Sequence, residues 1–362
     1  MEATSSTTST TSGFLSPVIS NPLFDRVRNT YRTFHEKRES LGLSNPGTVE
    51  KISKEVDQDV FLNNLAFTGV RAEFNKVIGV SPMFQLSHAF AMGAQGMPPY
   101  SYNAMYGSSK HFLQATIDSD LAVNGRFNRR ITNALVTKFS VNLPQDSMQQ
   151  PMLQAEADYN GADFTAVVKS MNPSIFNGGL TGMVIGSYLQ SVTPKLALGM
   201  EGMWQRLDMQ HPPDVMMSYV GRYKTREWIA SARVLGQGAV QASFWKRLSE
   251  KVEAGADLNL SFAGMGNPQA AMMGAPGKEG VATFGVKYDF RASSYRAQID
   301  SQGKMGCLLE KSIAPPVRVT FSGELDQWKQ QVKVGLAVSI ESADPELMEQ
   351  QQSMTEGPSI PF

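Results

Sequence analysis

The sequence has one cysteine and few charged residues, and each shortage excludes a class of protein. The single Cys307 cannot form a disulfide framework within the chain and provides no cysteine-based metal site. Charged residues make up 18% of the chain, where about a quarter is usual in soluble globular proteins. Lys plus Arg and Asp plus Glu both total 33, and this balance argues against a general nucleic-acid binder.

Long apolar runs are also missing. Hydrophobic residues make up 41% of the chain, yet no stretch approaches the roughly 18 consecutive apolar residues of a membrane helix. The apolar residues must therefore alternate with polar ones, as they do in the strands of a membrane β-barrel or of a soluble β-sandwich. Residues 1–4 show neither a secretory signal nor the Arg-rich start of a cleaved targeting segment. If the protein is sent to an organelle, we expect its targeting signal to lie elsewhere in the chain.

Motifs of catalysis and of metal binding are missing as well. The histidines show no HExxH spacing, and no cysteine or carboxylate grouping around them suggests zinc. Gly264-Met265-Gly266 begins like a dinucleotide-binding loop, but Gln269 takes the place of the next required glycine. The sequence contains neither a GxSxG elbow nor a P-loop. We expect no catalytic activity, no metal and no cofactor.

Before residue 65 the sequence predicts two regions. Residues 1–20 are dominated by Ser and Thr, a composition that supports no packed core and predicts disorder. Residues 21–64 predict two helices that begin at Asn21-Pro22 and Asn45-Pro46, each an N-cap residue followed by proline. The apolar stripe of the second helix consists of Val49, Ile52, Val56 and Val60. By this pattern alone, both could be surface helices that pack on a core.

From residue 65 onward the apolar period changes from 3.6 to 2, which is typical of strands. The final segment shows the alternation of apolar and polar residues: Val332, Lys333, Val334, Gly335, Leu336, Ala337, Val338, Ser339 and Ile340. About 19 such segments fill residues 65–341, with predicted starts at 65, 84, 100, 111, 122, 132, 152, 163, 180, 195, 216, 226, 238, 250, 280, 294, 304, 315 and 329. Their short connections predict a meander of antiparallel neighbours.

This many strands in one run favours a single closed barrel. A sandwich core is filled by about seven to nine strands, and no linker divides residues 65–341 into several domains. The longest irregular stretch, residues 264–280, fits a loop between two strands. Closure removes every sheet edge, as a bilayer demands, and so wide an interior retains water. We predict an all-β transmembrane barrel over residues 65–341, with a polar lumen and a tail at 342–362; a soluble all-β binding module is the distant alternative.

Two parts of the sequence carry a resemblance to a known family. Four residues fit the sorting signal of mitochondrial β-barrels, a polar residue, a glycine and two hydrophobic residues at fixed spacing: Lys333, Gly335, Val338 and Ile340. More specific are the segments Asn45-Pro46-Gly47-Thr48-Val49-Glu50, Val60-Phe61 and Phe67-Thr68-Gly69. Over about residues 45–341 the chain resembles the channel-forming subunits of the translocase of the outer mitochondrial membrane, which are eukaryotic porins, and its Ser/Thr-rich start is similar to fungal members.

The resemblance implies an architecture. Eukaryotic porins have an odd number of strands, about 19 in the voltage-dependent anion channel. The first and last strands, near 65–76 and 329–340, are then expected to pair in parallel. The second N-terminal helical segment is expected inside the pore, with the residues Asn45, Pro46, Gly47, Val49, Ile52 and Val56.

The resemblance also implies a function. The expected activity is the passage of unfolded nuclear-encoded precursors through the mitochondrial outer membrane, from the cytosol to the intermembrane space. The implied partners are precursors with basic presequences, the receptor and small helical subunits of the translocase, the phospholipid bilayer and further copies of the chain in a dimer or higher oligomer. A metabolite or anion porin of the same superfamily is the alternative.

Basic presequences would favour weak acidic contacts along the pore wall. Asp118 and Asp120 are two positions apart, a spacing that places both carboxylates on one face of a strand. The same spacing recurs at Glu156 and Asp158, and at four-residue range the candidates are Glu253 and Asp257. The alternative for these acids is that neighbouring Lys or Arg residues balance them in a solvated lumen.

Overall fold

The computed structural model describes residues 42–63, 65–94, 96–145, 150–174, 180–206, 210, 212–262 and 279–343. The chain divides into two compact units, Met1–Leu43 and Ser44–Phe362, and the fold described below is that of the second. The predicted tail at 1–20, the first predicted helix up to residue 41, most of the 264–280 loop and the tail from residue 344 lie outside the described residues.

Strands account for most of the described chain. A short π-helix, η1 (Glu55–Val60), precedes them. The strands are β1 (Gly69–Val80), β2 (Met83–Met92), β3 (Tyr100–Gly107), β4 (His111–Asp118), β5 (Val123–Arg130), β6 (Leu135–Leu143), β7 (Met152–Asn160), β8 (Phe164–Ser174), β9 (Thr181–Ser191), β10 (Leu196–Arg206), β11 (Asp214–Lys224), β12 (Trp228–Leu235), β13 (Ala239–Ser249), β14 (Val252–Ser261), β15 (Glu279–Asp289), β16 (Ser293–Asp300), β17 (Lys304–Ala314), β18 (Val317–Asp326) and β19 (Gln331–Ala343). The prediction of about 19 strands is confirmed, and the predicted starts differ from the observed ones by at most four residues.

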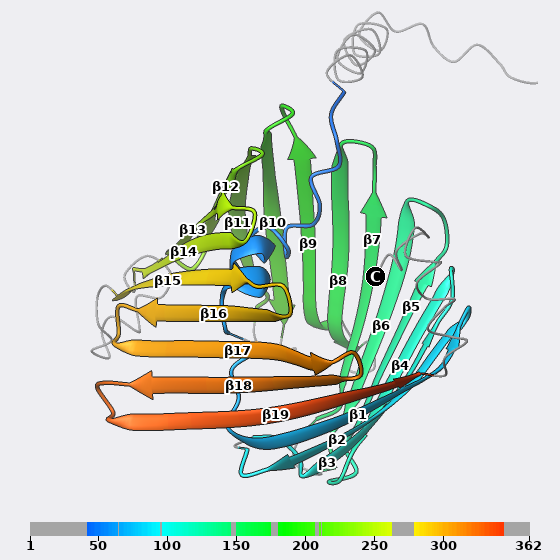
Figure 1. Ribbon diagram of the computed structural model, residues 1–362. Coiled ribbons are helices and arrows are strands. Elements are labelled where there is room, and N and C mark those ends of the chain that lie inside the picture. The colour runs from blue at the N-terminus through cyan, green and yellow to red at the C-terminus, as the bar shows by residue number, and fades with distance from the viewer. Residues whose placement is uncertain are drawn as a thin grey trace, which may run out of the picture. The chain divides into compact units, whose positions relative to one another are not determined.

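The strands form one sheet that closes on itself. Consecutive strands pair antiparallel, and the nineteenth strand returns to the first. β1 and β19 pair in parallel, from Gly69 opposite Gly335 to Val77 opposite Ala343. An odd number of alternating strands requires one parallel pair at closure, so the parallel pairing that the resemblance implied is confirmed (Figure 1).

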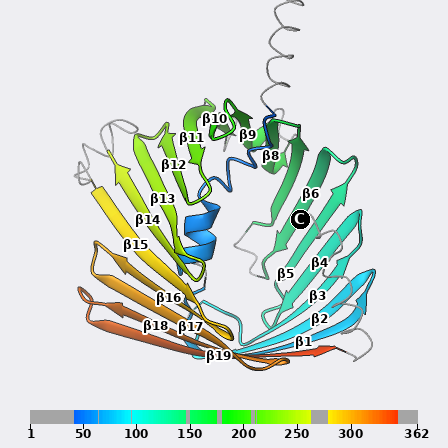
Figure 2. The same cartoon turned by 45° about the horizontal axis from the view of Figure 1, so that its top comes forward.

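The alternation of side chains gives the barrel an apolar outer face and a polar inner face. Large apolar side chains are exposed on the outside, among them Phe284, Val332 and Val334. Because residues paired across neighbouring strands point to the same face, the register identifies the inner residues around the ring. In Figure 2 the strands form a ring with η1 inside it. Within the part of the chain that the structure describes, no helix is both long and apolar enough to span a membrane.

The barrel has two rims, named here by the direction of the strands. Odd-numbered strands begin at the first rim and end at the second, and even-numbered strands run the opposite way. Gly69, where β1 begins, lies at the first rim, and Ala343, where β19 ends, lies at the second rim.

The seam between the first and last strands depends on a close approach at Gly335. A side chain at this inner position would meet the backbone oxygen of Phe67 and, at 2.7 Å, the Phe67 ring. The Phe67 N–H donates a hydrogen bond to Ser322 Oγ at 3.3 Å, which holds the residue over the seam. Gly335 therefore leaves the space through which the chain reaches β1.

We predict that Gly335→Ala destabilises the barrel. The added methyl group overpacks against backbone that cannot easily move, and we expect the free energy of unfolding to fall by about 1–3 kcal/mol. Thermal unfolding of the detergent-refolded protein measures this without involving cellular sorting. Gly202→Ala is the control, since no atom lies within 4 Å of a Cβ there. Equal stability of the two variants would contradict the prediction.

Candidate functional site

The inner wall of the barrel carries a segment of the same chain, residues 44–67, named here the inner segment. Its contacts pass along the wall in strand order. The Ser44 carbonyl accepts a hydrogen bond from Ser191 Oγ on β9 at 2.8 Å, and Glu50 and Glu55 contact β8 and β11. Farther on, the Leu62 N–H donates to Gln298 Oε1 on β16 at 2.8 Å, and Phe67 reaches β18 and β19. The inner segment thus covers the wall from β8 to β19.

Asn45 attaches the beginning of the inner segment to the connection between β7 and β8. Its Nδ2 donates to the carbonyl oxygens of Gly161 at 2.8 Å and Phe164 at 3.2 Å. Its Oδ1 accepts from the hydroxyl of Thr165 at 3.0 Å and from the N–H of Gly47 at 2.8 Å. Both N–H donors and both lone pairs of this amide are therefore occupied.

The helix predicted to begin at Asn45-Pro46 begins later, so its predicted start is wrong. Residues 45–48 have no regular secondary structure, turns follow, and η1 begins only at Glu55. The reason is that the Asn45 side chain bonds Gly47 and the barrel wall instead of capping a helix. Gly47, at φ +84°, has the left-handed conformation that ends such a turn.

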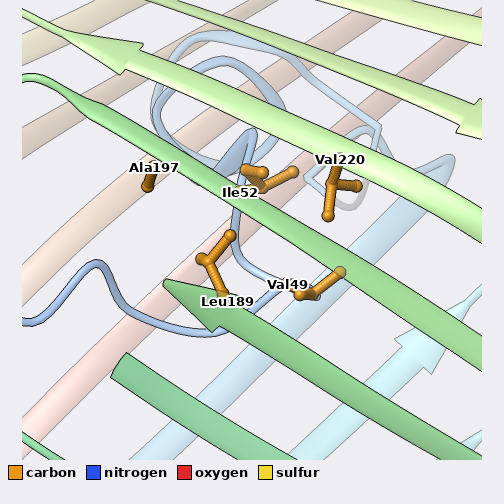
Figure 3. Packing of buried hydrophobic residues seen from close by; sticks show 5 residues of the cluster. All are labelled: Val49, Ile52, Leu189, Ala197 and Val220. Carbon is orange, nitrogen blue, oxygen red and sulfur yellow. The ribbon is translucent and has the colours of Figure 1, made fainter. Parts of the chain in front are cut away.

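Apolar side chains hold the first half of the inner segment. Val49 and Ile52 are buried against Leu189 of β9, Ala197 of β10 and Val220 of β11 (Figure 3). These three wall residues occupy inner positions, where most strands carry polar side chains. The stripe of apolar residues identified in the sequence therefore faces the wall.

Glycines in the wall make room for the second half. Val56, Val60 and Phe61 cluster with Ile229 of β12 and Trp245 of β13. Gly255 and Gly285 lie directly opposite each other on β14 and β15. A side chain at Gly255 would lie 3.2 Å from Val56, and one at Gly285 would lie 2.7 Å from the Phe61 ring. The segment consequently packs against wall backbone.

Cations from the wall bind the polar side of the inner segment. Arg222 forms an ion pair with Glu55, and Lys169 lies 3.6 Å from Glu50. Two further arginines donate to backbone carbonyls of the segment, Arg233 to Val49 at 3.2 Å and Arg296 to Gln58 at 3.3 Å.

The acidic candidates Glu156 and Asp158 are bound to a cation of the wall. Lys138 on β6 donates to Glu156 Oε1 at 2.7 Å and to Asp158 Oδ2 at 2.5 Å. Both carboxylates are less than 9% exposed. No sequence pattern links Lys138 to these acids, because only the pairing of β6 with β7 sets its place beside them.

Glu253 and Asp257 are also engaged. Arg247 lies 3.3 Å from Glu253, and Asp257 is buried and accepts a hydrogen bond from Asn259 Nδ2 at 2.6 Å. Of the six acidic candidates, Glu156, Asp158 and Glu253 are thus paired with a cation of a neighbouring strand, and Asp257 is bonded within β14.

Asp118 and Asp120 differ from the other candidates. Asp118 is the last residue of β4, at the first rim, and Asp120 is in the turn that follows. The expectation that both lie on one face of a strand is wrong, because β4 ends between them. Asp120 is exposed, and no described cation forms a salt bridge with either carboxylate.

The four residues of the predicted sorting signal lie on β19. Lys333 and Gly335 are opposite the inner residues Glu324 and Ser322, whereas Val338 and Ile340 have the opposite orientation, toward the outer face. Lys333 lies 3.9 Å from Glu324. Among the described residues, no three His, Cys, Asp or Glu side chains gather to hold a metal ion.

Comparison with known proteins gives consistent matches. The chain matches the family model of eukaryotic porins over residues 45–335. It is 46% identical over 345 residues to the mitochondrial import receptor subunit Tom40 of Neurospora crassa, covering 94% of this chain and 96% of the relative. Identity to the corresponding subunit of Saccharomyces cerevisiae is 42% over 344 residues, covering 92% and 88%. The human homolog is 26% identical over 309 residues, covering 82% and 79%.

We predict that Lys138→Met destabilises the barrel because it leaves two buried carboxylates unpaired. The expected loss is about 2–3 kcal/mol in the free energy of unfolding. Denaturant titration in detergent measures it. The matched control adds Glu156→Gln and Asp158→Asn, which removes the uncompensated charge, and should recover at least half of the loss. A single variant as stable as the parent would contradict the role of Lys138.

We predict that Gly285→Ala loosens the inner segment while the strands remain paired. The methyl group would overlap the Phe61 ring, and a cost of about 1–2 kcal/mol corresponds to about tenfold faster amide exchange over residues 54–62. Hydrogen–deuterium exchange in detergent reports each region separately. Gly186→Ala serves as control because its Cβ has open space. Unchanged exchange in residues 54–62 would show that the glycine is not needed.

Proposed function

The chain belongs to the eukaryotic porin family, and on this basis we propose that it is a protein-conducting channel of the mitochondrial outer membrane. Its function is the passage of unfolded nuclear-encoded precursors from the cytosol to the intermembrane space. Relatives at 46% and 42% identity are named mitochondrial import receptor subunits, and each is covered over most of its length. The closed barrel with an apolar outside and a polar inside supports a membrane pore.

The observation that carries the proposal is the uneven cover of the inner wall. The hydrogen bonds and ion pairs of the inner segment described above reach strands from β8 to β18, its Phe67 also packs against β19, and none of these contacts involves β2 to β6. A barrel of nineteen strands is wide, and a segment fixed to one side leaves part of the lumen open. An unfolded chain could pass through this part.

A basic presequence would first contact acids that no wall cation neutralises. Asp118 and Asp120 meet this condition and lie at the first rim, whereas Glu156, Asp158 and Glu253 are paired with cations and Asp257 is buried. Exposed ion pairs are weak, and salt screens them, so such contacts would guide a chain without holding it. We propose Asp118 and Asp120 as the acids that presequences contact.

The proposed partners follow from the same function. Precursors would occupy the lumen, and the outer face would contact phospholipid together with receptor and small helical subunits of the translocase. We propose assembly as a dimer or higher oligomer through this outer face. A metabolite or anion porin is the alternative function, and the names of the relatives favour the import channel.

We predict that the refolded protein forms a large pore in a planar bilayer and that a basic presequence peptide blocks it transiently. Asp118→Asn with Asp120→Asn should weaken the block about two- to fivefold at low salt, as expected for exposed charges. The matched control is Glu253→Gln with Asp289→Asn, which removes two acids paired with Arg247 and Lys287.

Each outcome separates the alternatives. A pore that the peptide does not affect would indicate the metabolite porin, and the absence of a pore would contradict the channel. Equal weakening in the two double variants would show that net charge, and not the position of Asp118 and Asp120, governs the block.

A further inference from the structure

The inner wall contains a row of uncharged polar side chains across five neighbouring strands. The pairing places these residues directly opposite one another on β2 to β6, and we name them the neutral row: Ser87, Asn103, Thr116, Asn124 and Asn142. The next row along the strands adds Gln85, Gln114, Ser140 and, on β7, Gln154, with Met105 on β3 and one charged residue, Arg126 on β5, between them. Amide side chains thus cluster on one part of the wall.

The neutral row is accessible, in contrast to similar residues elsewhere on the wall. Its members are half-buried or exposed. On the side that the inner segment covers, Ser218, Ser231 and Ser243 occupy inner positions as well, but all three are buried. β2 to β6 lie on the opposite side of the ring from η1 (Figure 2).

The amides of the neutral row have hydrogen-bonding capacity to spare. Thr116 Oγ1 donates to Asn103 Oδ1 at 3.2 Å, which leaves the Asn103 NH₂ group available. Within the described chain, no side-chain hydrogen bond involves Asn124 or Asn142. The wall is hollowed here into a depression of about 220 Å³, lined by Gln114, Thr116, Asn124, Arg126, Ser140 and Asn142 among others.

We propose that the neutral row is a contact surface for the backbone of the translocating polypeptide, an inference that rests on the proposed function. An unfolded chain presents an N–H donor and a C=O acceptor at almost every residue. An Asn or Gln side chain offers both complementary groups, so it can pair with the backbone whatever the sequence of the passing chain. The contact is therefore suited to substrates that share only their backbone.

The absence of charge in the neutral row gives this surface a distinct property. Hydrogen bonds between neutral groups are weaker than those to charged groups, so a chain can exchange one partner for the next. Salt does not screen such contacts as it screens ion pairs. The neutral row differs in both respects from Asp118, which lies two residues beyond Thr116 on the same inner face of β4.

Site-specific photo-crosslinking tests the proposal in the assembled full-length protein. Benzoylphenylalanine is placed at Asn103, Asn124 and Asn142, and for comparison at the outward-facing neighbours Ala104, Val123 and Val141. Two precursors are arrested in transit, one spanning the pore with a basic segment and one with an uncharged segment. We expect both precursors to cross-link to the neutral row and neither to cross-link to the outer neighbours.

Further probe positions distinguish a failure of this inference from a failure of the proposed function. Probes at Glu201, Thr283 and Lys287 sample the rest of the inner wall. Cross-links at these positions without any at the neutral row would overturn this inference and leave the proposed function standing. No cross-link at any inner position would contradict the proposed function itself.

The import rate of a variant that lacks these amides is a second test. Asn103→Leu, Asn124→Leu and Asn142→Leu together retain similar volume and remove the hydrogen-bonding groups. We expect the import rate of both precursors to fall about fivefold, at all salt concentrations, while bilayer conductance is unchanged. The conservative set Asn103→Gln, Asn124→Gln and Asn142→Gln should import within about twofold of the parent. An unchanged rate in the leucine variant, with conductance intact, would overturn the proposal.

Discussion

The constraint on which this structure depends is that a bilayer offers no water to unpaired backbone groups. Each strand must therefore have two neighbours, and the pairing of β1 with β19 supplies the missing neighbour of both terminal strands. This pairing explains other features in turn. It is parallel because the strand number is odd. Its inner face carries Gly335 because Phe67, just before β1, lies directly over this position and leaves no space for a side chain.

The inner segment divides the lumen chemically. On the side that it covers, glycines, arginines and apolar residues of the wall contact the inner segment. The inner serines Ser218, Ser231 and Ser243 on that side are buried. On the other side the amides and hydroxyls of the neutral row stay half-buried or exposed, although Asn128 of β5 is buried. Such a division suits a pore that passes many substrates. The strong interactions of the wall bind the inner segment, and only weak ones are left to contact a passing chain.

The sequence predicts the strands, because these depend on the order of neighbouring residues. It does not predict contacts between strands, because these depend on the register in which the strands pair. A period of two identifies strands such as β14 and β19 because one face of each is apolar. The ion pairs of Lys138 with Glu156 and Asp158 join residues 18 and 20 positions apart, and only the pairing of β6 with β7 reveals them. Asn45-Pro46 has the composition of a helix start, but the Asn45 side chain forms hydrogen bonds with Gly161 and Thr165 of the wall and does not cap a helix. Asp120 was misplaced because a strand end cannot be located to the residue from alternation.

The path of the inner segment has a topological consequence. Ser44 lies beside Ser191 at the second rim, where β9 ends, and the segment descends through the lumen to Gly69 at the first rim. It therefore traverses the full depth of the barrel and acts as a twentieth crossing beside the nineteen strands. Ala343, at the end of β19, is again at the second rim. An odd-stranded barrel thereby regains the parity of an even one, with the chain entering its fold and leaving it on the same side of the membrane.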